Sequence, residues 1–88
     1  MVLLEPFALP SVDDYPIWRV DLDPKIQMVR KLSREFEAYY VPLDGIFAAK
    51  CARIKSAYWS EDGIHPTAAG HYLIAKAWIN TVCELYQM

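Results

Sequence analysis

The sequence predicts an α/β fold in which helices cover both faces of a parallel sheet. Short, continuously apolar runs at residues 2–4 and 39–43 are typical of buried parallel strands, and stretches with helical periodicity follow each of them. A strand, helix, strand order returns the chain to the same edge and makes the two strands parallel. Because two parallel strands seldom form a stable sheet alone, we expect the sheet to continue outside these 88 residues.

The first half of the chain is expected to hold one strand, one long loop and one helix. The run Val2-Leu3-Leu4 predicts a strand that Glu5-Pro6 closes. Residues 6–23 contain three prolines and several large apolar residues, so we expect a loop that packs down and lines a pocket. Asp23-Pro24 is typical of a helix start, and apolar residues then recur at helical spacing as far as Tyr39 or Tyr40.

The second half is expected to hold a strand and two helices. Residues 39–43 are β-rich, and Asp44-Gly45 ends them. Asp44 has two interpretations: it caps a helix over residues 46–54, or it lies at the carboxyl edge where open α/β sheets bind ligands. Thr67 is expected to cap a final helix that reaches about Tyr86 and is apolar around much of its circumference.

Composition and charge exclude several classes of protein. Hydrophobic residues make up 55% of the chain and charged residues 23%, which excludes an intrinsically disordered segment. The net charge is −2, although residues 25–55 carry seven basic and three acidic groups, a local charge of +4. A basic helix face of this kind is typically solvated, so no nucleic acid partner is expected.

Neither the cysteines nor the first residues indicate a special environment. Cys51 and Cys83 lie 32 positions apart without a CxxC motif or a Cys/His cluster, so free thiols and no metal are expected. Residues 1–5 lack the basic start of a secretion signal, and no apolar run approaches the roughly 20 residues of a membrane span. The chain is expected to be soluble, and its compartment stays open.

The residues that indicate chemistry are Asp62 and His65, in the string Asp62-Gly63-Ile64-His65-Pro66. A turn shaped by glycine and proline can direct a carboxylate and an imidazole three positions apart the same way. In a hydrolase, a histidine takes a proton from a hydroxyl nucleophile, and a carboxylate holds that histidine in the required tautomer. An isolated pair of this kind is more often structural, with Asp62 capping the turn and His65 an ordinary polar loop residue.

The longer string from Tyr58 to Ala75 resembles the last sequence block of the SGNH, or GDSL, hydrolases: Asp-x-x-His-Pro, a small residue, a glycine and an apolar helix. Residues 2–7 and 40–43 resemble that family's penultimate and final strands. The resemblance implies that residues 1–88 are the C-terminal portion of one three-layer α/β/α, flavodoxin-like hydrolase domain, here incomplete. It also implies that Asp62 and His65 are the acid and base of a Ser-His-Asp triad that acts on an ester without metal or organic cofactor.

The other parts of such a site are missing from the sequence. There is no Gly-Asp-Ser block, and the only asparagine, Asn80, lies late in the final helix. The nucleophile and the oxyanion donors are therefore expected in a missing N-terminal half. Position and spacing disfavour Ser60 as a local nucleophile and His71 as a metal ligand. Three aromatic residues are left open between pocket lining and core packing: Trp18, Tyr58 and Trp59.

Two interpretations of function therefore stand. In the first, the chain is the C-terminal segment of an SGNH-type ester hydrolase, supplies the Asp-His part of the triad and is inactive alone. In the second, it is a non-catalytic, truncated or self-associating module that buries its open sheet edge against another copy, as a homo-oligomer. Turnover of a simple ester and the oligomeric state in solution discriminate between the two.

Overall fold

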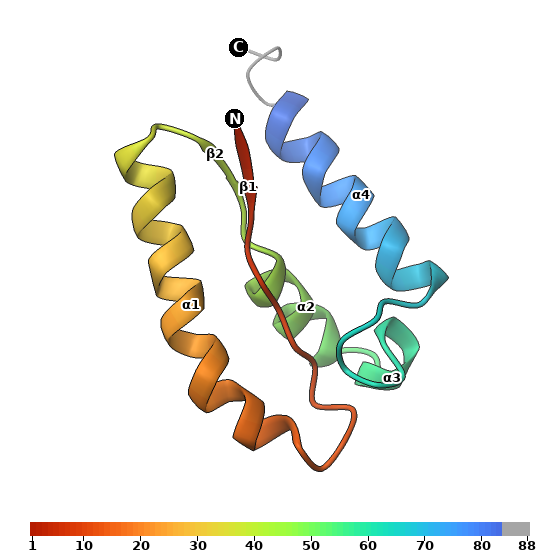
Figure 1. Ribbon diagram of the computed structural model, residues 1–88. Helices are drawn as coiled ribbons and strands as arrows, with labels where there is room; N and C mark the ends of the chain where they lie inside the picture. The colour runs from red at the N-terminus through yellow and green to blue at the C-terminus, as the bar shows by residue number, and fades with distance from the viewer. Residues whose placement is uncertain (84–88) are drawn as a thin grey trace.

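The computed structural model describes residues 1–83 as two parallel strands with helices on both sides (Figure 1). The elements, in chain order, are β1 (Val2–Leu4), α1 (Tyr15–Glu35), β2 (Tyr39–Val41), α2 (Leu43–Cys51), α3 (Ser56–Trp59) and α4 (Ala68–Cys83). β1 and β2 pair in parallel, with Val2 opposite Tyr39 and Leu4 opposite Val41. The α/β class and the parallel pair predicted from the sequence are confirmed.

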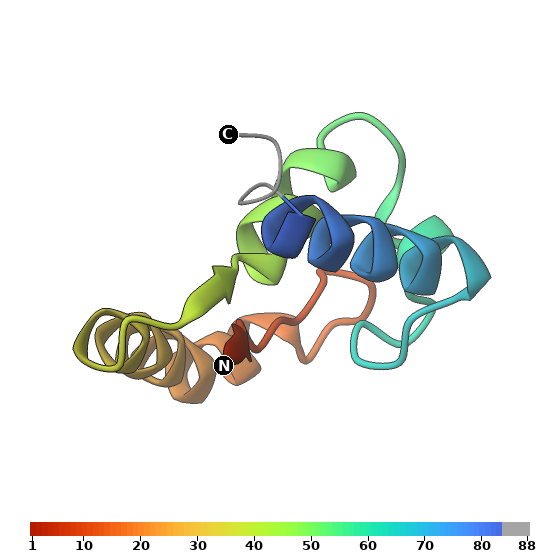
Figure 2. The same cartoon turned by 90° about the horizontal axis from the view of Figure 1, so that it is seen from above.

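The strand pair separates two helical layers. Helix α1 packs against both strands on one side, while α4 packs against β2 from the other, as the two views show together (Figures 1 and 2). The core lies on the α4 side and consists of Leu9, Val41, Leu43, Phe47, Trp59 and Leu73. Helix α2 contributes Phe47, whose ring centroid is 4.8 Å from that of Phe7 in the loop after β1. The apolar run of β2 therefore ends directly in the core.

The start of α1 differs from the prediction. The helix begins at Tyr15, with Pro16 in its first turn and Asp14 as the N-cap residue, so Pro24 lies inside it. Pro16 has the fixed φ that suits the first turn of a helix, so the helix starts there and not at Asp23-Pro24. Pro24 has no N–H to donate to the carbonyl of the residue four positions earlier. This stretch is exposed, so water can donate a hydrogen bond to that carbonyl instead. The predicted loop over residues 6–23 is wrong for its second half.

The helices after β2 also depart from the prediction in part. Helix α2 begins at Leu43 with Pro42 as N-cap, so Asp44 does not cap it. A further short helix, α3, was not predicted from the sequence. Thr67 does cap α4 as predicted, because the N–H of Gly70 donates to the Thr67 hydroxyl at 3.1 Å. The predicted end of that helix at Tyr86 lies outside the described residues.

Two loops meet at the carboxyl end of the strands. The N–H of Leu9, after β1, donates to the carbonyl of Gly63 at 2.9 Å. The hydroxyl of Ser11 donates to the carbonyl of Ser60 at 2.6 Å. The segment between α3 and α4 is therefore held against the segment that follows β1, at the edge where parallel α/β sheets usually carry their sites.

None of the helices within residues 1–83 combines the length and apolarity that crossing a membrane requires.

Candidate active site

The candidate site is the loop of residues 60–67, which joins α3 to α4. Ser60 anchors its start, because this residue is fully buried and its hydroxyl lies 2.9 Å from the carbonyl oxygen of His65 and 3.2 Å from Oδ1 of Asp62. With a single proton the hydroxyl can donate to either oxygen. Thr67 anchors its end, since its hydroxyl bonds the carbonyl of Tyr58 at 2.7 Å. The loop is thus held by bonds within itself and by a bond from its end to α3.

Within this loop Asp62 and His65 are brought together. Oδ2 of Asp62 lies 2.7 Å from Nδ1 of His65. Oδ1 accepts the backbone N–H groups of Ile64 and His65, at 2.8 and 2.7 Å. The bond from the His65 ring is the largest cause that holds the pKa of Asp62 well below its usual range, and the two backbone bonds follow it. Asp62 is therefore an ionised carboxylate fixed at both oxygens.

The arrangement leaves one imidazole nitrogen free for chemistry. A carboxylate on Nδ1 favours the tautomer with the proton on that nitrogen, and Nε2 is then an acceptor. His65 exposes 83% of its side-chain surface, and Asp62 exposes 53%. Both border a depression of about 360 Å³. An oriented imidazole with an accessible Nε2 can take a proton from a hydroxyl placed next to it.

Two glycines allow the loop to adopt this path. Gly63 has φ +84°, and a Cβ at this position would come within 2.5 Å of the Leu9 carbonyl oxygen. Gly70, in the first turn of α4, has a similar constraint, because a Cβ there would lie 2.3 Å from the carbonyl oxygen of Trp59. Only glycine fits both places without moving backbone. The glycines of the motif therefore bring the loop close to the segment after β1 and α4 close to α3.

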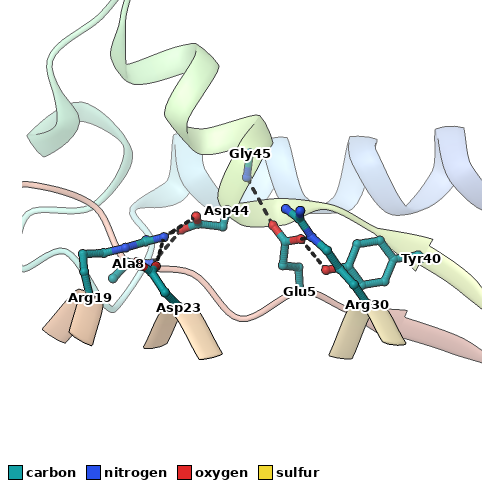
Figure 3. A network of polar contacts seen from close by, with 8 residues as sticks. All are labelled: Glu5, Ala8, Arg19, Asp23, Arg30, Tyr40, Asp44 and Gly45. Carbon is teal, nitrogen blue, oxygen red and sulfur yellow. Dashed lines mark hydrogen bonds and ion pairs between the residues drawn. The ribbon is translucent and has the colours of Figure 1, made fainter. Parts of the chain in front are cut away.

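A buried carboxylate, Glu5, directly follows β1 and binds groups from three other elements (Figure 3). Its side chain is fully buried and accepts from Nε of Arg30 at 3.0 Å, from the hydroxyl of Tyr40 and from the N–H of Gly45 at 3.2 Å. Burial of the phenol, followed by its bond to Glu5, raises the pKa of Tyr40 to about 12. Glu5 thus joins both strands to α1 and to the start of α2.

A second carboxylate, Asp44, is bound by Arg19 in the same view (Figure 3). The guanidinium makes two bonds to Asp44, at 2.7 and 2.9 Å, and also reaches Asp23 at 2.6 Å. The N–H of Ala8 donates to Oδ1 of Asp44 at 3.3 Å. The bond to Asp44 is the main reason that the pKa of Arg19 is raised. Asp44 therefore does not cap a helix, and its carboxylate is bound by Arg19 and not available to bind a ligand. It joins α2 to α1.

The aromatic residues left open by the sequence separate into two roles. Trp59 belongs to the buried core, and the exposed Tyr58 meets it edge to face at 4.9 Å between ring centroids. Trp18 lines an apolar pocket beside the candidate site.

His71 lies exposed in the first turn of α4, and no group of three or more His, Cys, Asp or Glu within residues 1–83 is placed to hold a metal ion.

The sequence alone does not indicate the roles of Glu5, Arg19 and Arg30. Their contacts join residues 25 positions apart, for both Arg30 to Glu5 and Arg19 to Asp44, and no local pattern contains them. One signal was present. An acidic residue directly after a buried strand, as at Glu5, needs a partner once it is buried, and the basic residues of the following helix are the nearest candidates in sequence.

The chain matches a C-terminal part of SGNH-type, or GDSL-type, hydrolases, which confirms the resemblance found in the sequence. One solved structure of this kind is a GDSL-like lipase from Parabacteroides merdae: it is 36% identical, with a TM-score of 0.81 over 91% of this chain and 38% of its own. Another is LAE5, an α/β hydrolase from the metagenome of Lake Arreo, 26% identical with a TM-score of 0.80 over 92% of this chain and 37% of its own.

A curated relative supports the same match at lower identity. An acetylxylan esterase from Geobacillus stearothermophilus is 23% identical over 82 residues, which is 93% of this chain and 37% of that protein. No family model matches the sequence. The chain therefore spans less than two fifths of the length of the proteins that it matches, and its two-stranded parallel sheet is consistent with an incomplete α/β fold.

Proposed function

We propose that this chain supplies the acid and base residues of a serine-type ester hydrolase. In this proposal residues 1–88 are the C-terminal part of a single SGNH hydrolase domain, and a serine nucleophile with its oxyanion donors comes from polypeptide outside them. The observation that carries the proposal is the contact of 2.7 Å between Nδ1 of His65 and Oδ2 of Asp62. This contact is the one that a triad needs between its base and its orienting acid.

The geometry supports the following mechanism. Nε2 of His65 accepts the proton of the serine hydroxyl as the oxygen attacks the ester carbonyl, and the imidazolium that forms is stabilised by Asp62. The imidazolium then returns the proton to the departing alcohol, which leaves an acyl-serine. Water, activated by the same Nε2, hydrolyses that intermediate and releases the acid. Asp62 remains ionised throughout, which its lowered pKa favours.

Ser60 is not the nucleophile of this proposal. Its hydroxyl is buried and bonded within the loop, so it cannot approach an ester without the loop opening. The unpaired edge of β1 is consistent with further polypeptide beside it, and the nucleophile is proposed to lie in that polypeptide. Within residues 1–83 this strand pairs only with β2, so its other edge is open to a further strand, as expected of the penultimate strand of the family.

A chimera tests the proposal. The matching 38% of the Parabacteroides merdae lipase is replaced by these 88 residues, and hydrolysis of p-nitrophenyl acetate is followed after circular dichroism confirms folding. We expect the chimera to turn over the ester and to be labelled by a fluorophosphonate, whereas the chain alone does neither. Serine-dependent turnover by the chain alone, or a folded chimera that is labelled but does not use His65, contradicts the proposal.

A second candidate function is self-association without catalysis. Three large side chains on α4 are exposed, namely Tyr72, Trp78 and Ile79, and the free edge of β1 is open as well. Either surface could be buried against another copy. Sedimentation equilibrium of the chain discriminates the cases, because a self-associating module gives a dimer or larger species. A monodisperse monomer contradicts this second candidate.

A further inference from the structure

An apolar pocket of about 350 Å³ opens next to the candidate active site. Three segments that are far apart in the sequence form its walls: Phe7 and Ala8 after β1, Ile17, Trp18 and Leu22 on α1, and Ile64 in the loop between α3 and α4. Its volume lies within the range of about 300–1,000 Å³ that is usual for small-molecule sites. It exists only because α1 begins at Tyr15, nine residues before the start that the sequence predicted.

The pocket shares its wall with the residues proposed to act on the ester. Ile64 lines it and is the residue directly before His65. The ring of Trp18 lies 3.2 Å from the position that a Cβ on Gly63 would occupy, so the pocket and the loop are in close contact. A second apolar depression, lined by Pro16, Ile17, Val20 and Asp21, involves α1 and its start but no residue of that loop.

We propose that this pocket binds the acyl chain of the ester and that it favours chains longer than acetyl. This inference rests on the proposed function, since it assigns the substrate of that site. Six of the seven lining residues are apolar, and the seventh, Asp21, is paired with Lys25 at 2.8 Å. A sugar in this place would need several hydrogen-bonding groups, whereas an alkyl chain needs none. Each buried methylene improves binding by about fourfold at most.

Titration of the 88-residue chain with neutral esters tests the inference. Ethyl acetate, ethyl butanoate and ethyl hexanoate are added in turn, and the methyl NMR signals of Ile17, Leu22 and Ile64 are followed. We expect the dissociation constant to fall along the series, by up to about fourfold for each methylene. Because no turnover is needed, the result does not depend on a nucleophile.

A matched pair of variants locates the binding. Ile17→Asp places a carboxylate in the pocket wall, and Val20→Asp places one on the same helix outside it; both positions are exposed, at 72% and 79%. We expect Ile17→Asp to weaken binding of ethyl hexanoate by about fivefold or more, because a charge disfavours the alkyl chain. Val20→Asp is expected to leave the dissociation constant unchanged.

Three outcomes overturn the inference: no dependence on acyl length, equal losses in the two variants, or stronger shifts of the same methyls by an acetylated methyl xyloside. Failure of the pocket and failure of the proposed function are distinguishable. Length-dependent binding together with a folded, inactive chimera supports the pocket and counts against the function. An active chimera with no preference among acyl lengths does the reverse.

Discussion

Asp62 holds His65 from two sides, because one carboxylate oxygen lies 2.7 Å from Nδ1 of the ring and the other accepts the backbone N–H of the same residue at 2.7 Å. The two contacts fix the position of the ring relative to its own backbone. Without these contacts an exposed histidine would sample several rotamers, and it would lose that conformational entropy each time it adopted the reactive orientation. The loop therefore holds the imidazole in place before any substrate arrives.

The first prediction concerns the titration of Asp62. His65→Ala removes the largest cause of its lowered pKa, so we expect that pKa to rise toward the ordinary value of about 4. A carboxyl with a lowered pKa in the folded state contributes stability above its unfolded pKa and loses it as the pH falls. The variant should thus lose less stability than the parent as the pH drops below about 4. Carboxyl-carbon NMR and urea unfolding at several pH values measure both effects.

Ser60→Ala tests the anchor of the loop. The substitution removes the hydroxyl that lies 2.9 Å from the His65 carbonyl, and we expect a loss of about 1–2 kcal/mol in the free energy of unfolding. It should also weaken catalysis in the chimera, although the hydroxyl touches neither substrate nor the Nε2 atom. Ser56→Ala, in α3, is the control and should change stability by less than about 0.5 kcal/mol. Equal effects of the two substitutions contradict this role of Ser60.

The three glycines give a graded prediction. Gly63→Ala meets the Leu9 carbonyl and a φ of +84°, and Gly70→Ala meets the Trp59 carbonyl, so each should cost about 2 kcal/mol or more in the free energy of unfolding. Gly45 has open space around it and lies in α2, where alanine is favoured by about 0.5–1 kcal/mol. Urea unfolding of the three variants checks the order, and a destabilised Gly45→Ala would contradict it.

Glu5 is predicted to make a large contribution to the stability of the fold. Glu5→Ala leaves the Tyr40 hydroxyl and the Gly45 N–H without their acceptor, and we expect a loss of about 2–4 kcal/mol. Glu5→Gln keeps an acceptor oxygen and should lose less. The exposed pair of Asp21 and Lys25 is a control, because Asp21→Ala should change stability by less than about 0.5 kcal/mol. Glu5→Ala with parent stability in urea would show that the network is dispensable.

The sequence predicted what local patterns determine. Val2-Leu3-Leu4 indicated β1, Thr67 indicated the cap of α4, and the spacing of Asp62 and His65 indicated a turn that brings the two together. The start of α1 was predicted at Asp23-Pro24, which is wrong: the helix begins at Tyr15 with Pro16 in its first turn, and the exposed Pro24 is tolerated inside it.

What the sequence did not predict depends on contacts between distant residues. Asp44 has the residue type of a helix cap, but Arg19, 25 positions earlier, binds its carboxylate instead. Residues 6–23 were expected to line a pocket, but the part of Ile64 in its wall was not expected, because the pocket forms where the start of α1 meets two loops. Such contacts depend on tertiary packing, and the hydrophobic periodicity of the sequence does not predict them.

The most direct test of the central claim compares the two histidines of the chain in the chimera. We expect His65→Ala to lower kcat/KM for p-nitrophenyl acetate by about 10³-fold or more, because the base of the triad is lost. His71→Ala, six residues later and exposed on α4, should leave kcat/KM within about twofold of the parent chimera. An active chimera in which both variants retain the parent kcat/KM would contradict the claim that Asp62 and His65 carry the acid–base chemistry.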